Sequence, residues 1–218
     1  GRRLITKQNY ATLDDDDAFT EGDLDQRLAV MESAAQPDLV ISNGVRRDVN
    51  GQDSPCYDTL ADVPGSPLAA LFSRPWLNSG NALYRSQSIG VEYFEDPHAF
   101  AEWTWLAFKL GAAGKRIAVL EAPTFVIYDT AGSLSKSEAY EKSFMPLYER
   151  MLALQPPTDI VALIRRRMGS SWHDQSVLAL RDGQRLKALR LHVRSLALPG
   201  GARYLSYSRY LIPGWPLN

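Results

Sequence analysis

Apolar and polar positions change their period several times along residues 10–128, as they do where strands alternate with helices. Short apolar runs at 38–42 and 81–84 are typical of buried strands. In 21–35 and 100–113 the apolar side chains recur at helical spacing instead. The alternation predicts an α/β fold in which helices flank a mixed sheet.

The remaining elements follow from the same patterns and from the positions of proline and glycine. A turn is expected at Asn43-Gly44 or Asn50-Gly51, and the proline-containing stretch 52–75 is expected to be a surface loop. Only helical patterns remain near the C-terminus, which predicts one domain over 1–154 and a helical C-terminal extension over 155–218. Further strands are expected at 10–13, 116–120 and 124–128, and further helices at 136–154, 159–168, 176–180 and 185–198.

The composition excludes several classes of protein. Hydrophobic residues make up 45% and charged residues 22% of the 218 positions. No apolar run reaches the ~18 to 20 residues that a membrane-spanning helix needs. The single cysteine, Cys56, excludes an intramolecular disulfide. Because disulfides are rare in reducing compartments, these features predict a cytoplasmic protein.

Charge is distributed unevenly, although the net charge is only −1. Residues 1–62 hold thirteen acidic and six basic side chains, whereas residues 165–218 hold ten basic and two acidic ones. A basic tail attracts anionic surfaces, and we expect an anionic membrane surface, the inner face of the plasma membrane, rather than nucleic acid as its partner. One apolar face of the last long helix fits either an interfacial helix or a helix packed on its own catalytic domain. That face consists of Leu186, Leu189, Val193 and Leu196.

Four consecutive aspartates, Asp14 to Asp17, follow the β-favouring stretch 10–13. Side chains of an extended segment alternate, so Asp14 and Asp16 are expected to leave the strand end on the same side. Paired hard oxygen ligands suit Mg²⁺ or Mn²⁺, and Mg²⁺ is usually bound together with substrate phosphates. A solvated acidic loop that caps the next helix explains the same run. The residues alone leave both interpretations open.

Four segments in this order resemble a bacterial family 2 glycosyltransferase with the GT-A fold, over about residues 1–145. The resemblance implies a Rossmann-like mixed sheet. It also implies that the family's N-terminal nucleotide-binding portion is missing, because only thirteen residues precede the aspartates. The four segments are 10–17 (YATLDDDD), 78–85 (NSGNALYR), the helix that begins at Glu102, and Gly132-Ser133-Leu134-Ser135.

In that family the aspartate motif holds a divalent cation against the two phosphates of a nucleotide-sugar. The resemblance therefore implies Mn²⁺ or Mg²⁺ at Asp14, Asp16 and Asp17, with Asp14 nearest the sugar or ribose. It implies a nucleotide-diphosphate sugar as donor, and as acceptor a glycan or lipid-linked glycan of surface polysaccharide synthesis. The residues implied to contact substrate are Asp15, Asn78, Ser79, Gly80, Asn81, Trp103 and Asp129.

Some of these positions have a plain structural explanation as well. The Asn-Ser segment fits an Asx-type turn before a strand. Asp129 stands where many family members have a histidine, and it equally fits a turn cap. Both interpretations stay open at the level of sequence.

The general base of the family belongs to a Glu-Asp pair at the start of a helix. It takes the proton of the acceptor hydroxyl in an inverting transfer. Here the pair is Glu102-Trp103, so the residue most often assigned as base is replaced. The candidates for that role are Glu102, Glu95 and Asp96.

Two other functions are compatible with the residues. In a haloacid-dehalogenase-type phosphatase, Asp14 and Asp16 would act as nucleophile and acid, although Ala18 and Phe19 follow where that family expects Thr or Val. The absent Glu-Asp pair also fits a non-catalytic domain that binds sugars or a membrane. Sugar transfer from a nucleotide donor distinguishes the glycosyltransferase from both alternatives. Phosphatase activity identifies the haloacid-dehalogenase type.

Overall fold

The computed structural model describes residues 6–129 and 138–211, and the chain divides into two compact units. Unit 1 is Gly1–Phe144 and unit 2 is Met145–Asn218. The division falls inside helix α4 (Glu138–Ala153), whereas the sequence placed the boundary after residue 154. In the described residues, no helix is both long and apolar enough to cross a bilayer.

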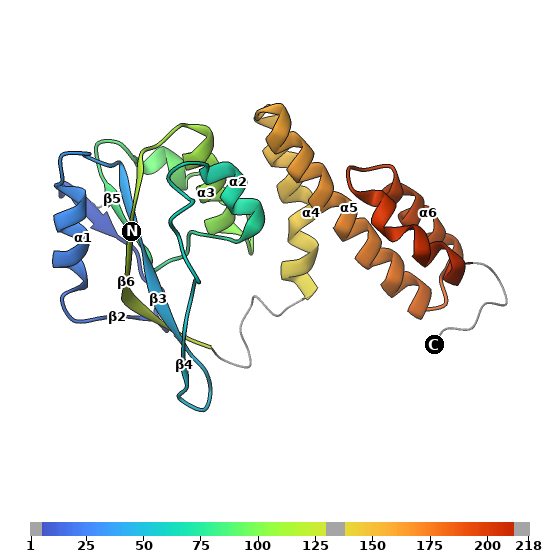
Figure 1. Cartoon of the computed structure of the whole chain (residues 1–218), viewed down its shortest axis with the longest axis horizontal. Coiled ribbons are helices and arrows are strands. Elements are labelled where there is room, and N and C mark those ends of the chain that lie inside the picture. Colours follow the sequence, from blue (N-terminus) through green and yellow to red (C-terminus); the bar gives the residue numbers. More distant parts are fainter. Residues whose placement is uncertain (1–5, 130–137, 212–218) are drawn as a thin grey trace. The chain divides into compact units, whose positions relative to one another are not determined.

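Unit 1 is an α/β unit built on a mixed six-stranded sheet, as the alternating pattern predicted (Figure 1). The strand order is β1-β5-β3-β6-β2, with β4 paired to β3. Only the central β3 and β6 run parallel; the other pairs are antiparallel. The elements in chain order are β1 (Asn9–Ala11), β2 (Ala18–Phe19), α1 (Asp23–Met31), β3 (Leu39–Arg47), β4 (Asp53–Pro55), α2 (Pro67–Ser73), β5 (Ala82–Arg85), the 3-10 helix η2 (Val91–Phe94), α3 (Glu102–Ala112) and β6 (Ile117–Tyr128).

Helices cover the sheet because the central strands are apolar on both faces. Residues 39–41 of β3 are fully buried. On the α1 side, Met31 packs against Val40 and Leu83. Helices α2 and α3 lie on the other side of the sheet (Figure 1), and α3 contributes the buried Phe108 and Leu110.

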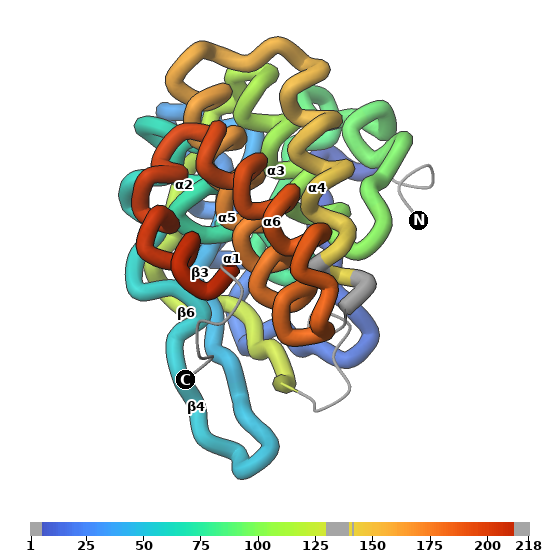
Figure 2. Tube along the Cα trace, turned by 90° about the vertical axis from the view of Figure 1, so that its right-hand side faces the viewer, coloured from blue at the N-terminus to red at the C-terminus, as the bar shows by residue number. Residues whose placement is uncertain are grey.

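The structure corrects two local predictions in unit 1 and selects between the two alternatives of a third. The stretch 52–75 is no plain loop, because it contains β4 and α2, whose first residue is a proline in the position that helices tolerate. The two strands predicted between 116 and 128 are one strand, β6. The turn lies at Asn50-Gly51, where the β3–β4 hairpin extends away from the sheet (Figures 1 and 2).

Asn43-Gly44 lies inside β3, at a shift in the register against β6. Gly44 is required there by packing, since a Cβ atom would stand 2.3 Å from Cζ of the Phe125 ring. Phe125 is completely buried. The glycine therefore marks a close approach of ring and backbone rather than a turn.

Unit 2 is helical throughout its described residues. It contains the end of α4, then α5 (Thr158–Arg181), α6 (Arg185–Leu196) and the 3-10 helix η4 (Gly201–Leu211). The sequence predicted two helices where α5 runs continuously. The core of unit 2 joins α5 to α6 and consists of Ala179, Leu180, Ala188 and Leu191.

Two histidines lie among tyrosines beside this core. His173 stacks on Tyr204 with ring centroids 3.8 Å apart, and its ring lies 6.4 Å from that of His192. His192 Nε2 lies 2.8 Å from Ser208 Oγ. Within the described residues both Nδ1 atoms are buried without a hydrogen-bond partner. Burial lowers the pKa of both imidazoles. At His173 the charge of Asp174 raises the pKa and that of Arg203 lowers it, and at His192 the charge of His173 lowers the pKa further.

We expect unit 2 to lose stability in acid. Because the two pKa values are lower in the folded state, the histidines of the unfolded chain bind protons first as the pH falls. The free energy of unfolding is therefore unaffected by these groups above about pH 6.5 and declines below it. His173→Phe keeps the aromatic packing and removes one titrating group. Urea unfolding at about pH 7.5 and about pH 5.5 should show a smaller loss of stability in the variant than in the wild type; equal losses would contradict this account.

Candidate metal and substrate site

The four aspartates form a tight turn between β1 and β2. The strand ends at Ala11, earlier than the sequence indicated, and the backbone N–H of Asp17 donates to the carbonyl oxygen of Asp14 at 3.3 Å. Asp14 and Asp16 are exposed, and Asp17 is half-buried. The carboxylates therefore converge because the backbone turns, and strand alternation, which the sequence suggested, is not the cause.

Asp14, Asp16 and Asp17 each bring a carboxylate oxygen to within 4.8 Å of the others. An ion bound at about 2.1 Å by octahedral ligands needs oxygens no more than about 4.2 Å apart. The exposed side chains of Asp14 and Asp16 can rotate to meet that limit. Three hard oxygen donors on one turn are a ligand set for Mg²⁺ or Mn²⁺.

The electrostatics of the turn favour a cation as well. Burial raises the pKa of Asp17, and the charges of Asp16 and then Asp14 raise it further. Hydrogen bonds from the Tyr128 backbone and from Ser79 Oγ, 3.4 Å from Asp17 Oδ2, act in the opposite direction. The net repulsion among the carboxylates is what a bound divalent ion would relieve.

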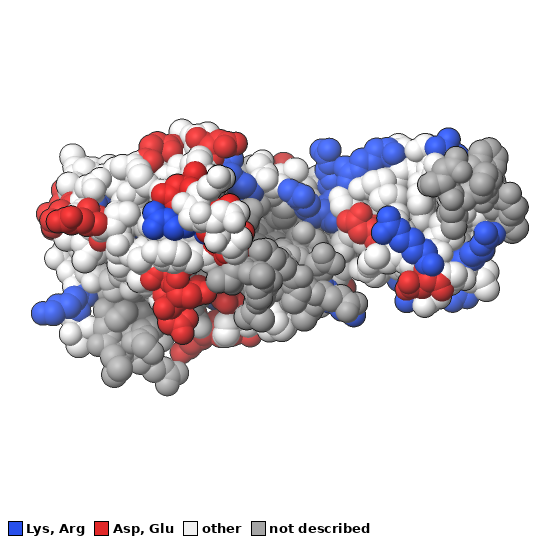
Figure 3. Space-filling view, turned by 90° about the horizontal axis from the view of Figure 1, so that it is seen from below, with Lys and Arg blue, Asp and Glu red and all other residues white. Residues whose placement is uncertain are grey.

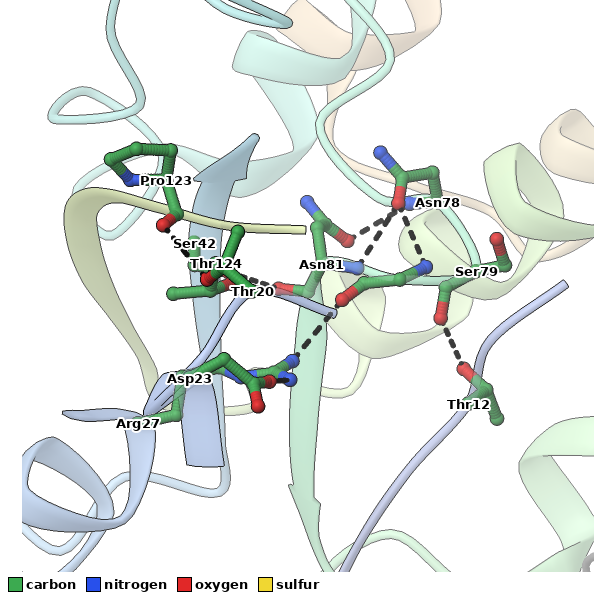
Figure 4. Close-up of polar contacts among 11 residues, drawn as sticks. Thr12, Thr20, Asp23, Arg27, Ser42, Asn78, Ser79, Asn81, Pro123 and Thr124 are labelled. Atoms are coloured by element: carbon green, nitrogen blue, oxygen red, sulfur yellow. Dashed lines mark hydrogen bonds and ion pairs between the residues drawn. The ribbon is translucent and has the colours of Figure 1, made fainter. Parts of the chain in front are cut away.

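Residues 78–81 form the loop beside the aspartates. Asn78 Oδ1 accepts from the backbone N–H groups of Gly80 and Asn81, each at 3.0 Å, which is the Asx-type turn considered from the sequence. Thr12 Oγ1 donates to the Ser79 carbonyl at 2.6 Å (Figure 4). The loop is therefore tied directly to the chain entering the aspartate turn.

Arg27 fixes the same loop from below, and sequence reasoning missed it. The side chain is completely buried, pairs with Asp23 one helical turn earlier, and donates from Nη1 to the Gly80 carbonyl at 3.2 Å (Figure 4). Its guanidinium also lies 4.8 Å from the centroid of the Phe19 ring. The i, i+4 spacing of Asp23 and Arg27 was the available signal, but most such pairs are exposed.

A cavity of about 1080 Å³ opens beside the turn, at the upper end of the range for ligand sites. Asp14, Asp15 and Asp16 line it together with basic and aromatic side chains from distant parts of unit 1. The other polar or aromatic lining residues are Arg46, Tyr57, Asp58, Arg74, Asn78, Phe100, Glu102, Trp103, Thr104 and Tyr140.

Glu102 and Trp103 reach this cavity because α3 begins there. Glu102 is exposed in the first turn, where the helix dipole stabilises a carboxylate. Burial raises the pKa of the Tyr140 hydroxyl, and the nearby charge of Glu102 raises it further. Trp103 is half-buried on the cavity wall, whereas Trp105 belongs to the core.

Tyr57 lines the cavity, and the sequence did not single it out. Its hydroxyl accepts a hydrogen bond from Asn78 Nδ2 at 2.9 Å, and burial raises its pKa, so it stays protonated at neutral pH. A hydroxyl that already accepts keeps its proton for another acceptor, such as a ligand oxygen. No motif marks Tyr57, because the hairpin and α2 together bring it to the site.

Several predicted site residues lie elsewhere. Asn81 is completely buried, donates from Nδ2 to the Trp76 carbonyl at 2.8 Å and accepts from the Asn78 backbone, so its amide serves the loop and is not exposed to a ligand. Glu95, Asp96 and Asp129 are absent from the cavity wall. Ser79 and Gly80 are buried and act through the backbone and Asp17. The Gly132–Ser135 segment lies outside the described residues.

Comparison of the sequence with models of protein families and with curated proteins gives no match. The indications of the site's chemistry lie in its own residues. The site consists of a turn with converging carboxylates, a large cavity beside it, and the separate carboxylate of Glu102 at the start of α3.

We expect Arg27→Met to destabilise unit 1 by about 3–5 kcal/mol, because it leaves the Asp23 carboxylate buried without its partner. The double variant Arg27→Met/Asp23→Leu should recover most of that loss. Urea unfolding measures both.

Arg47→Met is the matched control, since the Arg47–Asp53 pair is 40% and 46% exposed and should cost no more than about 1 kcal/mol. A cost for Arg27→Met as small as that for Arg47→Met would show that the buried pair does not hold the site loop.

Proposed function

We propose that unit 1 is the metal-binding and acceptor-binding part of a glycosyltransferase of the GT-A type, similar to family 2. It moves a sugar from a nucleotide-diphosphate sugar to a hydroxyl group of a glycan or lipid-linked glycan. The observation that carries the proposal is the convergence of Asp14, Asp16 and Asp17 beside a cavity that also contains Glu102.

The aspartate turn fits a divalent cation by donor type, spacing and charge. Asp16 and Asp17 would hold Mn²⁺ or Mg²⁺, with Asp14 completing the set toward the sugar. When bound, the ion supplies Lewis-acid stabilisation of a diphosphate leaving group.

Basic side chains of the cavity complement the same leaving group. Arg46 is exposed on the cavity wall, and no ion pair is found for it in the parts of the chain that the structure describes. Arg74 lines the same cavity and pairs with Asp62, which is not part of the cavity wall. A guanidinium donates to phosphate oxygens in a bidentate manner, so Arg46 is suited to a diphosphate.

Glu102 is the candidate general base. A carboxylate at the cavity wall can take the proton of an acceptor hydroxyl as the hydroxyl attacks the sugar carbon, which fits an inverting transfer. Glu95 and Asp96 are poorer candidates because neither lines the cavity. Trp103 offers an aromatic face to a sugar ring, and the Tyr57 hydroxyl offers a donor to a sugar oxygen.

Metal binding should be visible without any catalysis. Mn²⁺ at about 100 times its Kd stabilises the folded state by about 2.7 kcal/mol, equivalent to a Tm increase of about 5 to 10 °C. Asp16→Asn should abolish this increase, and without metal it should raise Tm by about 1 to 2 °C because one repelling charge is gone. Asp25→Asn, an exposed acid on α1, should leave the metal-induced increase intact.

The nucleotide is identified in the same assay with UDP, TDP and GDP. A further increase that needs both Mn²⁺ and one nucleotide supports the transferase. If Mn²⁺ alone raises Tm and no nucleotide adds to it, the phosphatase and the non-catalytic binding domain become the better explanations. Hydrolysis of an aryl phosphate then distinguishes those two.

Glu102→Gln should reduce sugar transfer by about 10² to 10⁴-fold, as loss of a general base does, and should leave the Mn²⁺-induced increase in Tm unchanged. Glu95→Gln, an acid outside the cavity wall, is the matched control and should retain activity. Full activity of Glu102→Gln with loss in Glu95→Gln would assign the base to the loop before α3.

A further inference from the structure

Helix α6 exposes a stripe of large apolar side chains. Leu186 is 74% exposed, Leu189 45% and Val193 56%. Their spacing of i, i+3 and i+7 places them within about 60° of one another around the helix axis. The three residues, called the α6 stripe below, form one continuous apolar surface.

The α6 stripe is not the side of the helix that packs within unit 2. The buried positions of α6 are Ala188, Leu191, His192 and Ser195, which lie on the opposite side by the same 100° rotation per residue. Ala188 and Leu191 belong to the core shared with α5. The helix therefore has apolar side chains on two sides, and the described residues of unit 2 pack against only one of them.

Basic residues flank the α6 stripe on both sides. Around the helix axis, Arg185 lies on one side of the stripe, and Arg190 and Arg194 lie on the other. Helix α6 contains no acidic residue, and no ion pair is found for Arg185, Lys187 or Arg190 within 6–129 and 138–211. Arg194 lies over the Trp172 ring, 5.1 Å from its centroid. An apolar stripe flanked by cations without acidic partners is the arrangement of a helix that lies in a membrane interface.

The charge of the whole unit agrees with this. Unit 2 holds eleven basic and four acidic residues. On the face of unit 2 at the right of Figure 3, Lys and Arg cover more surface than Asp and Glu. A second copy placed on the α6 stripe would bring two such basic surfaces together, whereas anionic lipid headgroups neutralise them. Charge complementarity therefore favours lipid over self-association.

We propose that the α6 stripe docks on the surface of an anionic lipid bilayer, with Leu186, Leu189 and Val193 inserted below the headgroups and the flanking arginines paired to lipid phosphates. The binding is peripheral and reversible. It is independent of the chemistry of unit 1, so it stands or falls apart from the proposed transferase activity.

The experiment is flotation of the full chain with vesicles of phosphatidylcholine alone or of phosphatidylcholine with phosphatidylglycerol. Binding should be stronger to the anionic vesicles and should fall at high salt, which screens the charges. Arg190→Gln should weaken binding to the anionic vesicles about fivefold, the effect expected of one basic residue near such a surface. Leu186→Gln/Leu189→Gln should weaken it about tenfold or more.

Matched controls lie in unit 1: Leu24→Gln, an apolar side chain 47% exposed on α1, and Lys7→Gln, an exposed cation. Neither should change binding. Gln is used because it keeps helix propensity close to that of Leu and Arg. Absence of binding to anionic vesicles, or equal losses in the α6 variants and the controls, overturns the proposal.

Coverage of the stripe by protein is tested without lipid. Light scattering reports whether the wild type is a dimer that Leu186→Gln converts to a monomer, and thermal unfolding reports whether Leu186→Gln destabilises the chain more than Leu24→Gln. Either result shows that a second copy or unit 1 occupies the stripe, and it overturns the proposal. A monomer whose stability is unchanged by Leu186→Gln supports it.

Discussion

The buried pair of Arg27 and Asp23 is the interaction on which the geometry of unit 1 depends. A guanidinium taken out of water needs partners for its donors, and Arg27 finds two of them, a carboxylate of its own helix for Nη2 and the Gly80 carbonyl for Nη1. Its Nε is buried without a partner among the described residues. The bond to the Gly80 carbonyl connects α1 to the loop before β5. Because Ser79 in that loop contacts both Thr12 and Asp17, the position of the aspartate turn follows from a cation buried beneath it.

The cavity illustrates how one turn becomes a site. The aspartates supply negative charge on one wall, α3 supplies Glu102 and Trp103, and the hairpin and α2 supply Arg46, Tyr57 and Arg74. The aspartate turn, the segment from the hairpin to α2, and α3 are far apart in sequence. The parallel pairing of β3 with β6 holds the sheet on which they are assembled.

Local patterns predicted the elements well where periodicity was strong, and poorly where tertiary contacts decide. The α/β alternation, α1, α3 and the strands near 39 and 82 followed from spacing alone. The register shift at Asn43-Gly44 depends on the Phe125 ring, which lies some eighty residues later. The continuity of α5 and the burial of Arg27 likewise depend on partners that no window of sequence contains. Of the candidate site, the aspartates and Glu102 were predicted; Tyr57 and Arg27 were not.

The half-buried position of Asp17 has a consequence for how the turn responds to its surroundings. A proton and a divalent cation compete for the same oxygens, and the raised pKa of Asp17 strengthens the proton as a competitor. A cation held at the proposed site would therefore bind less tightly as the pH falls. Acid and a low metal concentration would act on such a site in the same direction.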